Sequence, residues 1–585
     1  MKPRYPVLCH LLLTFITIFL LSKAILAESR EPRVKLSFTR YYNYEELTDA
    51  LKMLAKAYPQ FLKLESIGKS YEGRDIWAMT INNPETGPEM TKAAMYIDGN
   101  IHGNEIQASE VCLYTIWYLM ENHGKIKKIT ALVDQRVFYI LPTVNPDGRA
   151  FWFDQPNTSS SSRGGVKPVD NDNDGLFDED GYDDLDGDGE VLQMRKRDPE
   201  GRFKADPEDP RLMIYVREGE KGEYTRLGLE GIDNDGDGKI NEDGPGGYDP
   251  NRDWPARWQP RYLQYGVGDF PLHLPESQAV AKFVLAHPNI AGVQAYHNSG
   301  GMILRGPGSK DIGEYPGRDI QVYNQLGEKG EKILPFYRYM VIWKDLYTVY
   351  GGFINWTCEA LGIFSFTNEL FSSYQYFKRK GRDEGDWRQR FLARSKERME
   401  FNDLVEFGDM FVEWKPYKHP QFGDIEIGGW KRFSRRVNPT FMLPELCHRN
   451  TAFTLLHADQ MPMPIIKNVE ISRLGDNVFK LRVTLVNERI IPTMSQMTSD
   501  NQLHRPDVVT LAGKYVKVLS AGFVENKWLG PVSLIEKQPE RIVLKSGIGG
   551  NSTILIQWIV QGRGEARIKL DCLKGGIAEK LVHLE

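Results

Sequence analysis

Cysteine is scarce in this sequence, which has 585 residues and only five cysteines. They are widely separated, so they form none of the close pairs that hold structural zinc, and a chain of this length does not require a disulfide framework. After the N-terminus there is no apolar run long enough to cross a bilayer. There is also no stripe of basic residues interleaved with aromatic ones, the pattern of a nucleic-acid-binding surface. We therefore expect no membrane span in the mature chain and no nucleic-acid partner.

The first residues have the pattern of a secretory signal peptide. Lys2 and Arg4 precede an apolar run over residues 7–21, and Ala24 and Ala27 supply small residues for cleavage. A membrane anchor is the alternative, but the apolar run is short for a span. We expect residues 1–27 to be removed and the mature protein to be secreted or periplasmic.

The length of the chain and its 41% hydrophobic residues predict more than one folded domain. Strand-like and helix-like patterns alternate over residues 35–460, which is typical of an α/β domain, and are interrupted at 156–248 by a segment rich in Gly, Asp and Asn. The expected helices are 44–58, 105–120, 275–286 and 450–457, and the expected strands are 75–81, 95–98, 137–141, 292–296 and 363–366. Short β-rich runs over 462–585 predict a smaller all-β sandwich domain.

Two His-x-x-Glu motifs are candidates for the first half of a metal site. His273 and Glu276 sit where Pro275 should begin a helix, so an ordinary helix N-terminus explains them. His102 and Glu105 instead follow an expected strand and precede an expected helix, a position that often carries chemistry in α/β folds. His297 follows another expected strand. Zinc favours such N and O ligands, and catalytic sites use three of them plus water.

These residues are part of an ordered series of motifs spread over residues 38–455. In chain order the motifs are Ile67-Gly-Lys-Ser70-Tyr-Glu-Gly-Arg74, Asp98-Gly-Asn-Ile-His-Gly-Asn-Glu105, Val144-Asn-Pro-Asp-Gly148, Met194-Arg-Lys196, Asp249-Pro-Asn-Arg252, His297 and Ser365-Phe-Thr-Asn-Glu-Leu370. The series resembles the zinc metallocarboxypeptidases related to carboxypeptidase A. That resemblance implies a mixed-sheet α/β/α catalytic domain that hydrolyses peptides from their C-termini.

The resemblance also implies the catalytic roles. His102, Glu105 and His297 match the zinc ligands. Glu369 matches the general base, whose carboxylate takes a proton from zinc-bound water and returns it to the leaving amine. Arg195 matches the arginine that stabilises the oxyanion developing on the scissile carbonyl.

Substrate-binding roles follow from the same resemblance. Asn251 and Arg252 match the clamp for the terminal carboxylate of the substrate, a task suited to a bidentate guanidinium. Tyr347 matches the mobile tyrosine of the active site. Ile354 falls at the base of the specificity pocket, where an apolar residue favours an apolar or aromatic C-terminal side chain.

The sequence departs from the family pattern at two places. Asn298-Ser299 follows the third ligand where the family commonly has Ser-Tyr or Gly-Gly. Asn104 replaces an arginine that some members have, which puts extended subsites in doubt. Neither change affects a metal ligand or the base.

The interrupting segment contains three Asp-x-Asp-x-Asp-Gly loops. Residues 170–190 hold 11 acidic side chains and no basic one. Alternating carboxylates with a glycine at the sixth position converge on a hard cation such as Ca²⁺, although the glutamate that an EF-hand has at position twelve is missing. The loops resemble the calcium repeats of thrombospondin-type segments, and a solvated acidic loop is the alternative. The candidate calcium ligands are Asp170, Asp172, Asp174, Asp178, Asp184, Asp186, Asp188, Asp233, Asp235 and Asp237, and Asp180, Asn241 and Asp243 are possible further ligands.

The acidic loops precede Arg195 and Asn251 by only a few residues. We therefore predict that calcium rigidifies the segments that deliver the oxyanion arginine and the carboxylate clamp. Two other functions stay open at this point. The same hydrolase could act on bacterial cell-wall peptides, or an inactive peptidase scaffold could serve as a calcium-dependent binding or adhesion protein. The presence of all three ligands and of the base argues against the second.

Overall fold

The computed structural model describes residues 31–171, 173–373, 387–526, 528 and 530–585. The signal peptide expected at 1–27 and the candidate ligand Asp172 lie outside these residues. The chain divides into a short unit, Met1–Ser37, and a large one, Phe38–Glu585, whose fold is described below. Among the described residues, no helix has the length and apolar character needed to cross a membrane.

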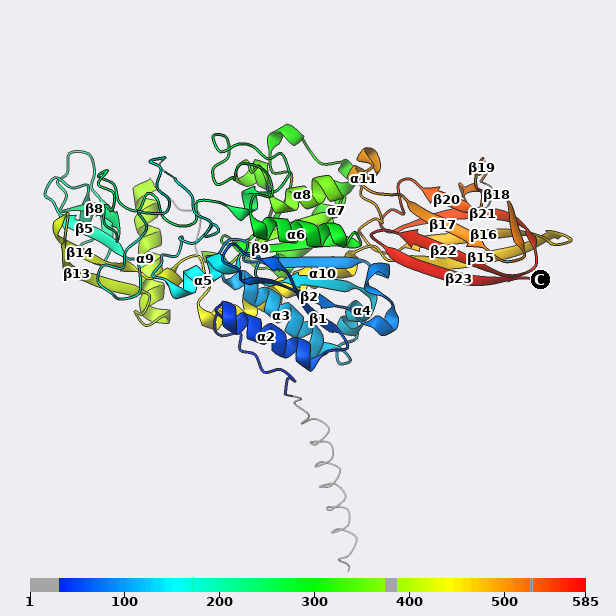
Figure 1. Cartoon of the computed structure of the whole chain (residues 1–585), viewed down its shortest axis with the longest axis horizontal. Helices are drawn as coiled ribbons and strands as arrows, with labels where there is room; N and C mark the ends of the chain where they lie inside the picture. The colour runs from blue at the N-terminus through cyan, green and yellow to red at the C-terminus, as the bar shows by residue number, and fades with distance from the viewer. Residues whose placement is uncertain (1–30, 172, 374–386, 527, 529) are drawn as a thin grey trace, which may run out of the picture. The chain divides into compact units, whose positions relative to one another are not determined.

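The centre of the large unit is a mixed eight-stranded sheet (Figure 1). The strands, in sheet order, are β1 (Leu62–Lys69), β2 (Asp75–Ile81), β4 (Val137–Leu141), β3 (Ala94–Gly99), β9 (Ile290–Asn298), β12 (Phe364–Leu370), β10 (Met302–Arg305) and β11 (Arg338–Val341). Strands β4, β3, β9 and β12 run parallel to one another. Every residue of β3, β4 and β9 is buried. Strands buried on both faces have continuous apolar sequences, which is why these three could be predicted.

Helices cover both faces of this sheet. Their bounds are α2 (Tyr44–Ala57), α3 (Gln107–Asn122), α4 (Lys127–Gln135), α5 (Pro146–Asp154), α6 (Pro275–Ala286), α7 (Gly317–Ile333), α8 (Phe353–Leu361) and α10 (Leu443–Gln460). Helices α6 and α8 share one core with the sheet, formed around Tyr96, Tyr139, Phe283 and Trp356. On β12, Phe366 packs against Tyr323 of α7 and Phe453 of α10. The expected α/β/α arrangement is confirmed.

A second sheet lies where the sequence predicted no core. Its strands, in sheet order, are β13 (Phe411–His419), β14 (Gly423–Trp430), β5 (Gln193–Arg197), β8 (Tyr224–Leu229), β6 (Phe203–Ala205) and β7 (Met213–Tyr215), and α9 (Trp387–Val405) precedes β13. Leu192 and Met194 pack against Ile425 and Ile427 in a small separate core. The strands of the insertion are short, and β5 finds its partner β14 more than 200 residues away. A local sequence pattern cannot reveal such a pairing.

The C-terminal part is all β, as the sequence predicted. One sheet contains β15 (Pro464–Gly475), β16 (Val478–Asn487), β21 (Ser552–Gly562), β18 (Val516–Val524) and β19 (Val532–Leu534). The other contains β20 (Arg541–Leu544), β17 (Asp507–Ala512), β22 (Gly564–Cys572) and β23 (Gly576–Leu584), and α11 (Gln496–Asn501) lies in a connection. Residues of both sheets, such as Leu481 and Leu570, share one core around Trp558. A shared core between two sheets defines a sandwich.

Candidate metal and peptide-binding site

The predicted metal ligands converge from two neighbouring strands of the central sheet. His102 and Glu105 lie in the turn between β3 and α3, and His297 lies in β9. Nδ1 of His102 is 3.0 Å from Glu105 Oε1. Nδ1 of His297 is 2.9 Å from Glu105 Oε2 and 3.2 Å from Nδ1 of His102. All three side chains are buried.

This donor set fits zinc. Two imidazole nitrogens and a carboxylate are typical ligands of catalytic zinc, and ligands about 2.1 Å from a tetrahedral ion lie about 3.4 Å from one another. The observed separations, 2.9–3.2 Å, are close to that spacing. No metal is present in the structure, so the fit rests on the donor atoms and their convergence. His273 and Glu276 form no such group, because Glu276 lies in the first turn of α6 and accepts the backbone N–H of Tyr71.

Asp249 orients the first metal ligand. Its Oδ1 lies 2.9 Å from Nε2 of His102. A carboxylate in that position accepts the ring N–H and leaves Nδ1 free for the metal. Burial alone would raise the pKa of Asp249, but His102, Arg252 and Arg163 together hold that pKa well below its usual range. Sequence reasoning had placed Asp249 in a motif without giving it a role.

Glu369 reaches the site through the register of two parallel strands. Glu369 of β12 pairs directly with His297 of β9, so both side chains leave the sheet at the same level. Glu369 lines the pocket that also contains His102 and His297. Burial raises the pKa of Glu369 to about 7, and the nearby Glu105 carboxylate acts in the same direction.

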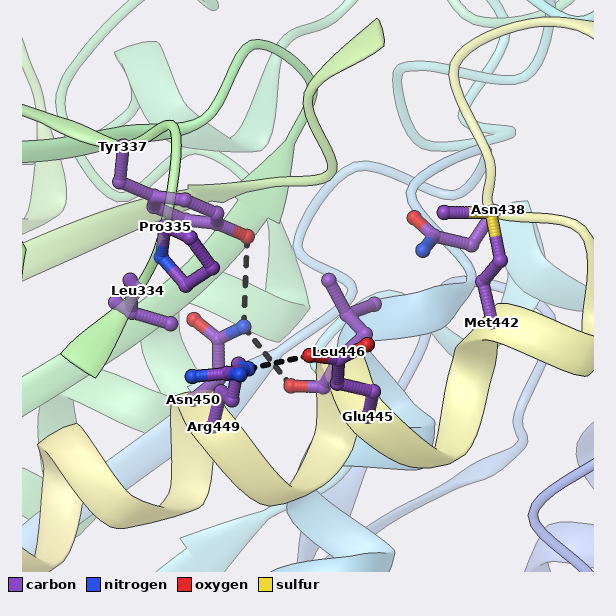
Figure 2. A pocket seen from close by; sticks show the side chains of 9 residues that line it. All are labelled: Leu334, Pro335, Tyr337, Asn438, Met442, Glu445, Leu446, Arg449 and Asn450. Atoms are coloured by element: carbon purple, nitrogen blue, oxygen red, sulfur yellow. Dashed lines mark hydrogen bonds and ion pairs between the residues drawn. The ribbon is translucent and has the colours of Figure 1, made fainter. Parts of the chain in front are cut away.

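The far end of β12 is held by α10 and by Tyr337. The side-chain amide of Asn368 donates to Oδ1 of Asn450 at 2.9 Å, and the backbone N–H of Phe371 donates to the hydroxyl of Tyr337 at 3.0 Å. Figure 2 shows Asn450 and Tyr337 directed toward each other in a small pocket above α10, joined by a 3.4 Å hydrogen bond. These contacts fix the strand on both sides of Glu369.

Arg195 does not line this pocket, contrary to the prediction that it faces the scissile carbonyl. Its guanidinium lies between the rings of Tyr224 and Trp414, at 4.2 and 4.1 Å, and pairs with Glu426 at 2.7 Å. Arg195 belongs to β5 of the second sheet. The two rings and the carboxylate hold this arginine in the second sheet, and it is not among the residues that line the pocket.

Arg163 is the arginine that the structure brings to the metal cluster. Its Nη1 lies 3.2 Å from Glu105 Oε1, its Nε lies 3.2 Å from Asp249 Oδ2, and it lines the pocket. The turn of the metal ligands holds its backbone, because the N–H of Gly103 donates to the carbonyl of Arg163 at 3.2 Å. A Cβ on Gly103 would lie 2.4 Å from the carbonyl oxygen of Ser162, so a glycine is required for this approach.

The predicted carboxylate clamp lies in the same pocket. Asn251 and Arg252 belong to a short helical turn, Pro250–Arg252, and both line the pocket. Asn251 is fixed because its Oδ1 accepts the backbone N–H of Phe353 at 2.9 Å. Arg252 is only 7% exposed, and its Nε–H has no hydrogen-bond partner among the described residues. A buried guanidinium with a free donor suits an anionic ligand.

The remaining wall of the pocket is mostly apolar. Tyr347 is 57% exposed at the pocket rim, whereas Ile354 of α8 is buried in its lining. The other apolar lining residues are Leu304, Ile342, Leu346, Val349 and Phe353. A pocket that combines an apolar wall with the buried guanidinium of Arg252 suits an apolar side chain next to a carboxylate.

The two departures from the family pattern lie beside this pocket. Asn104 is buried, and its backbone N–H donates to the carbonyl of Ser162 at 3.1 Å. Arg436, which the sequence did not single out, lies 3.6 Å from Glu105 and donates to the carbonyl of Asn298 at 2.8 Å. A second arginine therefore stands near the metal cluster although Asn104 carries no charge.

The acidic loops are only partly assembled as predicted. Carboxylate oxygens converge in the second loop (Asp184, Asp186 and Asp188) and in the third (Asp233, Asp235 and Asp237). Convergence in the first loop stays a prediction, because Asp172 lies outside the described residues. The Asp170 oxygens accept loop N–H groups of Asn173 and Gly175, as the first aspartate of each of the other two loops does. Asp178 accepts the backbone N–H of Val169. Among the described residues, it belongs to none of the converging acidic groups. Asp174 converges with Glu179 and Asp235, a grouping that was not predicted.

Comparisons with known proteins identify a family for most of the catalytic part. A family model described as zinc carboxypeptidase matches residues 47–197 and 215–387, more than half of the chain. A model of a domain of unknown function matches residues 464–583. Carboxypeptidase D of Homo sapiens is 34% identical over 114 residues, which are 20% of this chain and 8% of that protein. The zinc carboxypeptidase of Saccharothrix mutabilis subsp. capreolus is 32% identical over 111 residues, 19% of this chain and 25% of that protein.

Other similar proteins include a yeast protein described as inactive. The inactive metallocarboxypeptidase ECM14 of Saccharomyces cerevisiae is 34% identical over 117 residues, 20% of this chain and 26% of that protein. The crystal structure of thrombin activatable fibrinolysis inhibitor matches with a TM-score of 0.43 at 16% identity, over 74% of this chain and 77% of that one. The chain thus spans at most about a quarter of the length of these curated relatives. The family match over more than half of the sequence, together with the converging donors, establishes that the chain belongs to the zinc carboxypeptidase family.

Proposed function

We propose that this protein is an active zinc carboxypeptidase that removes C-terminal residues from peptides. The observation that carries the proposal is the composition of one pocket, in which the metal donors His102 and His297 lie with Glu369, Arg163 and Arg252. Zinc held by His102, Glu105 and His297 would supply Lewis-acid polarisation of the scissile carbonyl and would acidify a bound water.

Glu369 is the general base of the proposed mechanism. Its carboxylate takes a proton from the attacking water and delivers it to the leaving amine. Arg163 supplies the fixed positive charge for the oxyanion that develops on the carbonyl. Arg252 and Asn251 bind the terminal carboxylate, which places the last peptide bond beside the metal donors. Tyr347 at the rim closes over the bound peptide.

The substrate is a peptide or protein C-terminus with an apolar last residue. Ile354 and the apolar lining favour such a side chain by burying it, at about 25 cal/mol per Å². We also propose that the protein is exported, on the strength of the signal pattern at residues 1–27. The acidic insertion binds Ca²⁺ in this proposal, supported by the convergence of Asp184, Asp186 and Asp188 and of the third loop.

Peptides that differ only at the C-terminus test this function. Hydrolysis should require a free carboxylate, and a terminal Phe or Leu should be released faster than Lys or Asp. Equal cleavage of free and amidated peptides would contradict the role of Arg252. Cleavage confined to peptides with D-residues or isopeptide bonds would identify a cell-wall hydrolase instead.

A further inference from the structure

The acidic insertion joins the catalytic domain through two chain segments that lie side by side. One follows Arg163 and the other precedes Asp249. Near the metal site, the N–H of Gly165 donates to the carbonyl of Tyr248 at 3.2 Å. Farther out, Asp180 and Asp243 form an antiparallel bridge, with a backbone hydrogen bond of 3.0 Å. We call these two segments, the described residues of 163–180 and residues 242–249, the neck of the insertion.

Acidic side chains converge at the outer end of this neck. Asp180 forms one group with Asp235 and Glu242, and Glu179 forms another with Asp174 and the same Asp235. Within each group the carboxylate oxygens lie within 4.8 Å of one another. The third acidic loop therefore meets both segments of the neck through Asp235.

Several of these carboxylates have one buried oxygen without a hydrogen-bond donor, although the other oxygens of Asp180 and Asp243 accept amide N–H groups of Asn234 and Asn171. Asp180 and Asp243 have no exposed surface. One oxygen of each, together with Glu179 Oε2 and Glu242 Oε2, has no hydrogen-bond donor among the described residues. The amide oxygen of Asn241 is in the same condition. Buried oxygens of this kind are costly unless hydrogen bonds or a counter-charge satisfy them.

We propose that Glu179, Asp180, Asp235, Glu242 and Asp243 form a divalent-cation site of the calcium class that clamps the two segments of the neck together. All the donors are oxygens, which favours a hard cation such as Ca²⁺. The site lacks the nitrogen ligands that zinc usually has. Asp235 lies within one of the Asp-x-Asp-x-Asp-Gly motifs, and the sequence offered Asp180 and Asp243 as possible further ligands. The sequence did not indicate Glu179 or Glu242, nor that these residues gather at one point.

The clamp bears on catalysis through the inner end of the neck. Arg163 and Asp249 are the residues of the two segments at the metal site, and a 3.2 Å ion pair joins their side chains. Asp249 orients His102, and Arg163 lies against Glu105. A Cβ on Gly164 would lie 2.2 Å from the carbonyl oxygens of Gly246 and Tyr248, so the segments have little room to slide. A cation at the outer end therefore positions both side chains without touching the substrate.

Calcium binding to the full-length, zinc-loaded chain tests the site itself. Glu242→Gln removes one buried oxygen charge, and Glu200→Gln is the matched control, because Glu200 is exposed in the same insertion. After calcium is stripped and zinc restored, calorimetric titration with Ca²⁺ should show fewer ions bound to Glu242→Gln than to the wild type, with Glu200→Gln unchanged. An equal number of ions bound with equal affinity by Glu242→Gln would overturn the proposal. Asp180→Asn provides a second variant with the same expectation.

The thermal unfolding midpoint and the kinetics complete the test. The wild-type midpoint should rise with Ca²⁺ at constant zinc content. An unchanged midpoint would contradict the clamp, whether or not the two variants fold. Calcium-free, zinc-loaded enzyme should lose about tenfold in kcat/KM. Only this kinetic consequence rests on the proposed peptidase function. A chain that binds Ca²⁺ at the clamp but cleaves no peptide refutes the function and keeps the site, whereas an active chain without the binding refutes the site.

Discussion

The imidazole of His102 contacts two carboxylates, Glu105 through Nδ1 and Asp249 through Nε2. The first contact is local and could be predicted from the His-x-x-Glu spacing. The second joins residues 147 positions apart and could not be predicted from spacing. The same holds for Arg163, whose placement depends on backbone hydrogen bonds to the turn of the metal ligands. The sequence therefore predicts donor types well and predicts their supporting contacts poorly.

Arg163 and Arg195 give a matched pair of substitutions. Arg163→Gln should lower kcat about 10²–10³-fold, because it removes a charge beside the reacting carbonyl. Arg195→Gln should leave kcat/KM within about threefold and should lower the free energy of unfolding by about 1–3 kcal/mol, since it breaks a buried pair between two rings. Steady-state kinetics and denaturant unfolding measure the two effects. A large loss of kcat in Arg195→Gln, with kcat unchanged in Arg163→Gln, would instead assign the oxyanion role to Arg195.

Asp249→Asn should weaken zinc binding about 10–100-fold, because the amide no longer supports the His102 ring with a full negative charge. Competition with a zinc indicator measures the dissociation constant. Glu200→Gln removes a carboxylate charge from the exposed surface and should change nothing. A zinc affinity of Asp249→Asn equal to that of the wild type would show that the 2.9 Å contact does not orient the ligand.

At the scale of elements, the site depends on strand register and on one turn. The β9–β12 pairing sets Glu369 level with His297, and the turn after β3 carries the other two ligands. Buried strands such as β3, β4 and β9 were predictable because both faces are apolar. The end of β12 was not, because Asn368 and Glu369 are polar, and their hydrogen bonds and site contacts come from other elements.

Gly103 tests how closely the metal turn and the Arg163 segment must approach. Gly103→Ala places a methyl group 2.4 Å from the Ser162 carbonyl oxygen and should cost about 1–3 kcal/mol of stability while lowering kcat. Gly165→Ala is the control, since no atom lies within 4 Å of its added Cβ. Thermal unfolding and kinetics on the two zinc-loaded variants decide. A Gly103→Ala enzyme with wild-type kcat and stability would show that the approach is not tight.

At the scale of the whole chain, the hydrophobic cores in its described part correspond to three sequence textures. The α/β core and the β-sandwich core were predictable from periodicity, whereas the small core of the second sheet was not, because β14 completes it from a distant segment. That calcium rigidifies the segment of Arg195 stays a prediction, but Arg195 pairs with Glu426 and does not line the pocket, so this half of the calcium prediction carries no oxyanion role. The other half, that calcium rigidifies the segment leading to the carboxylate clamp of Asn251 and Arg252, also stays a prediction. The neck extends this half to Arg163, which pairs with Asp249.

The central claim is that the metal donors and Glu369 act together on a peptide, and zinc-loaded Glu369→Gln tests it most directly. The amide keeps the size of the side chain but cannot accept a proton from water, so kcat should fall by about 10²–10⁴-fold on a peptide with a free, apolar C-terminus. Zinc content should stay at one ion per chain, because Glu369 is not among the converging donors. A zinc-loaded Glu369→Gln enzyme with wild-type kcat would contradict the account.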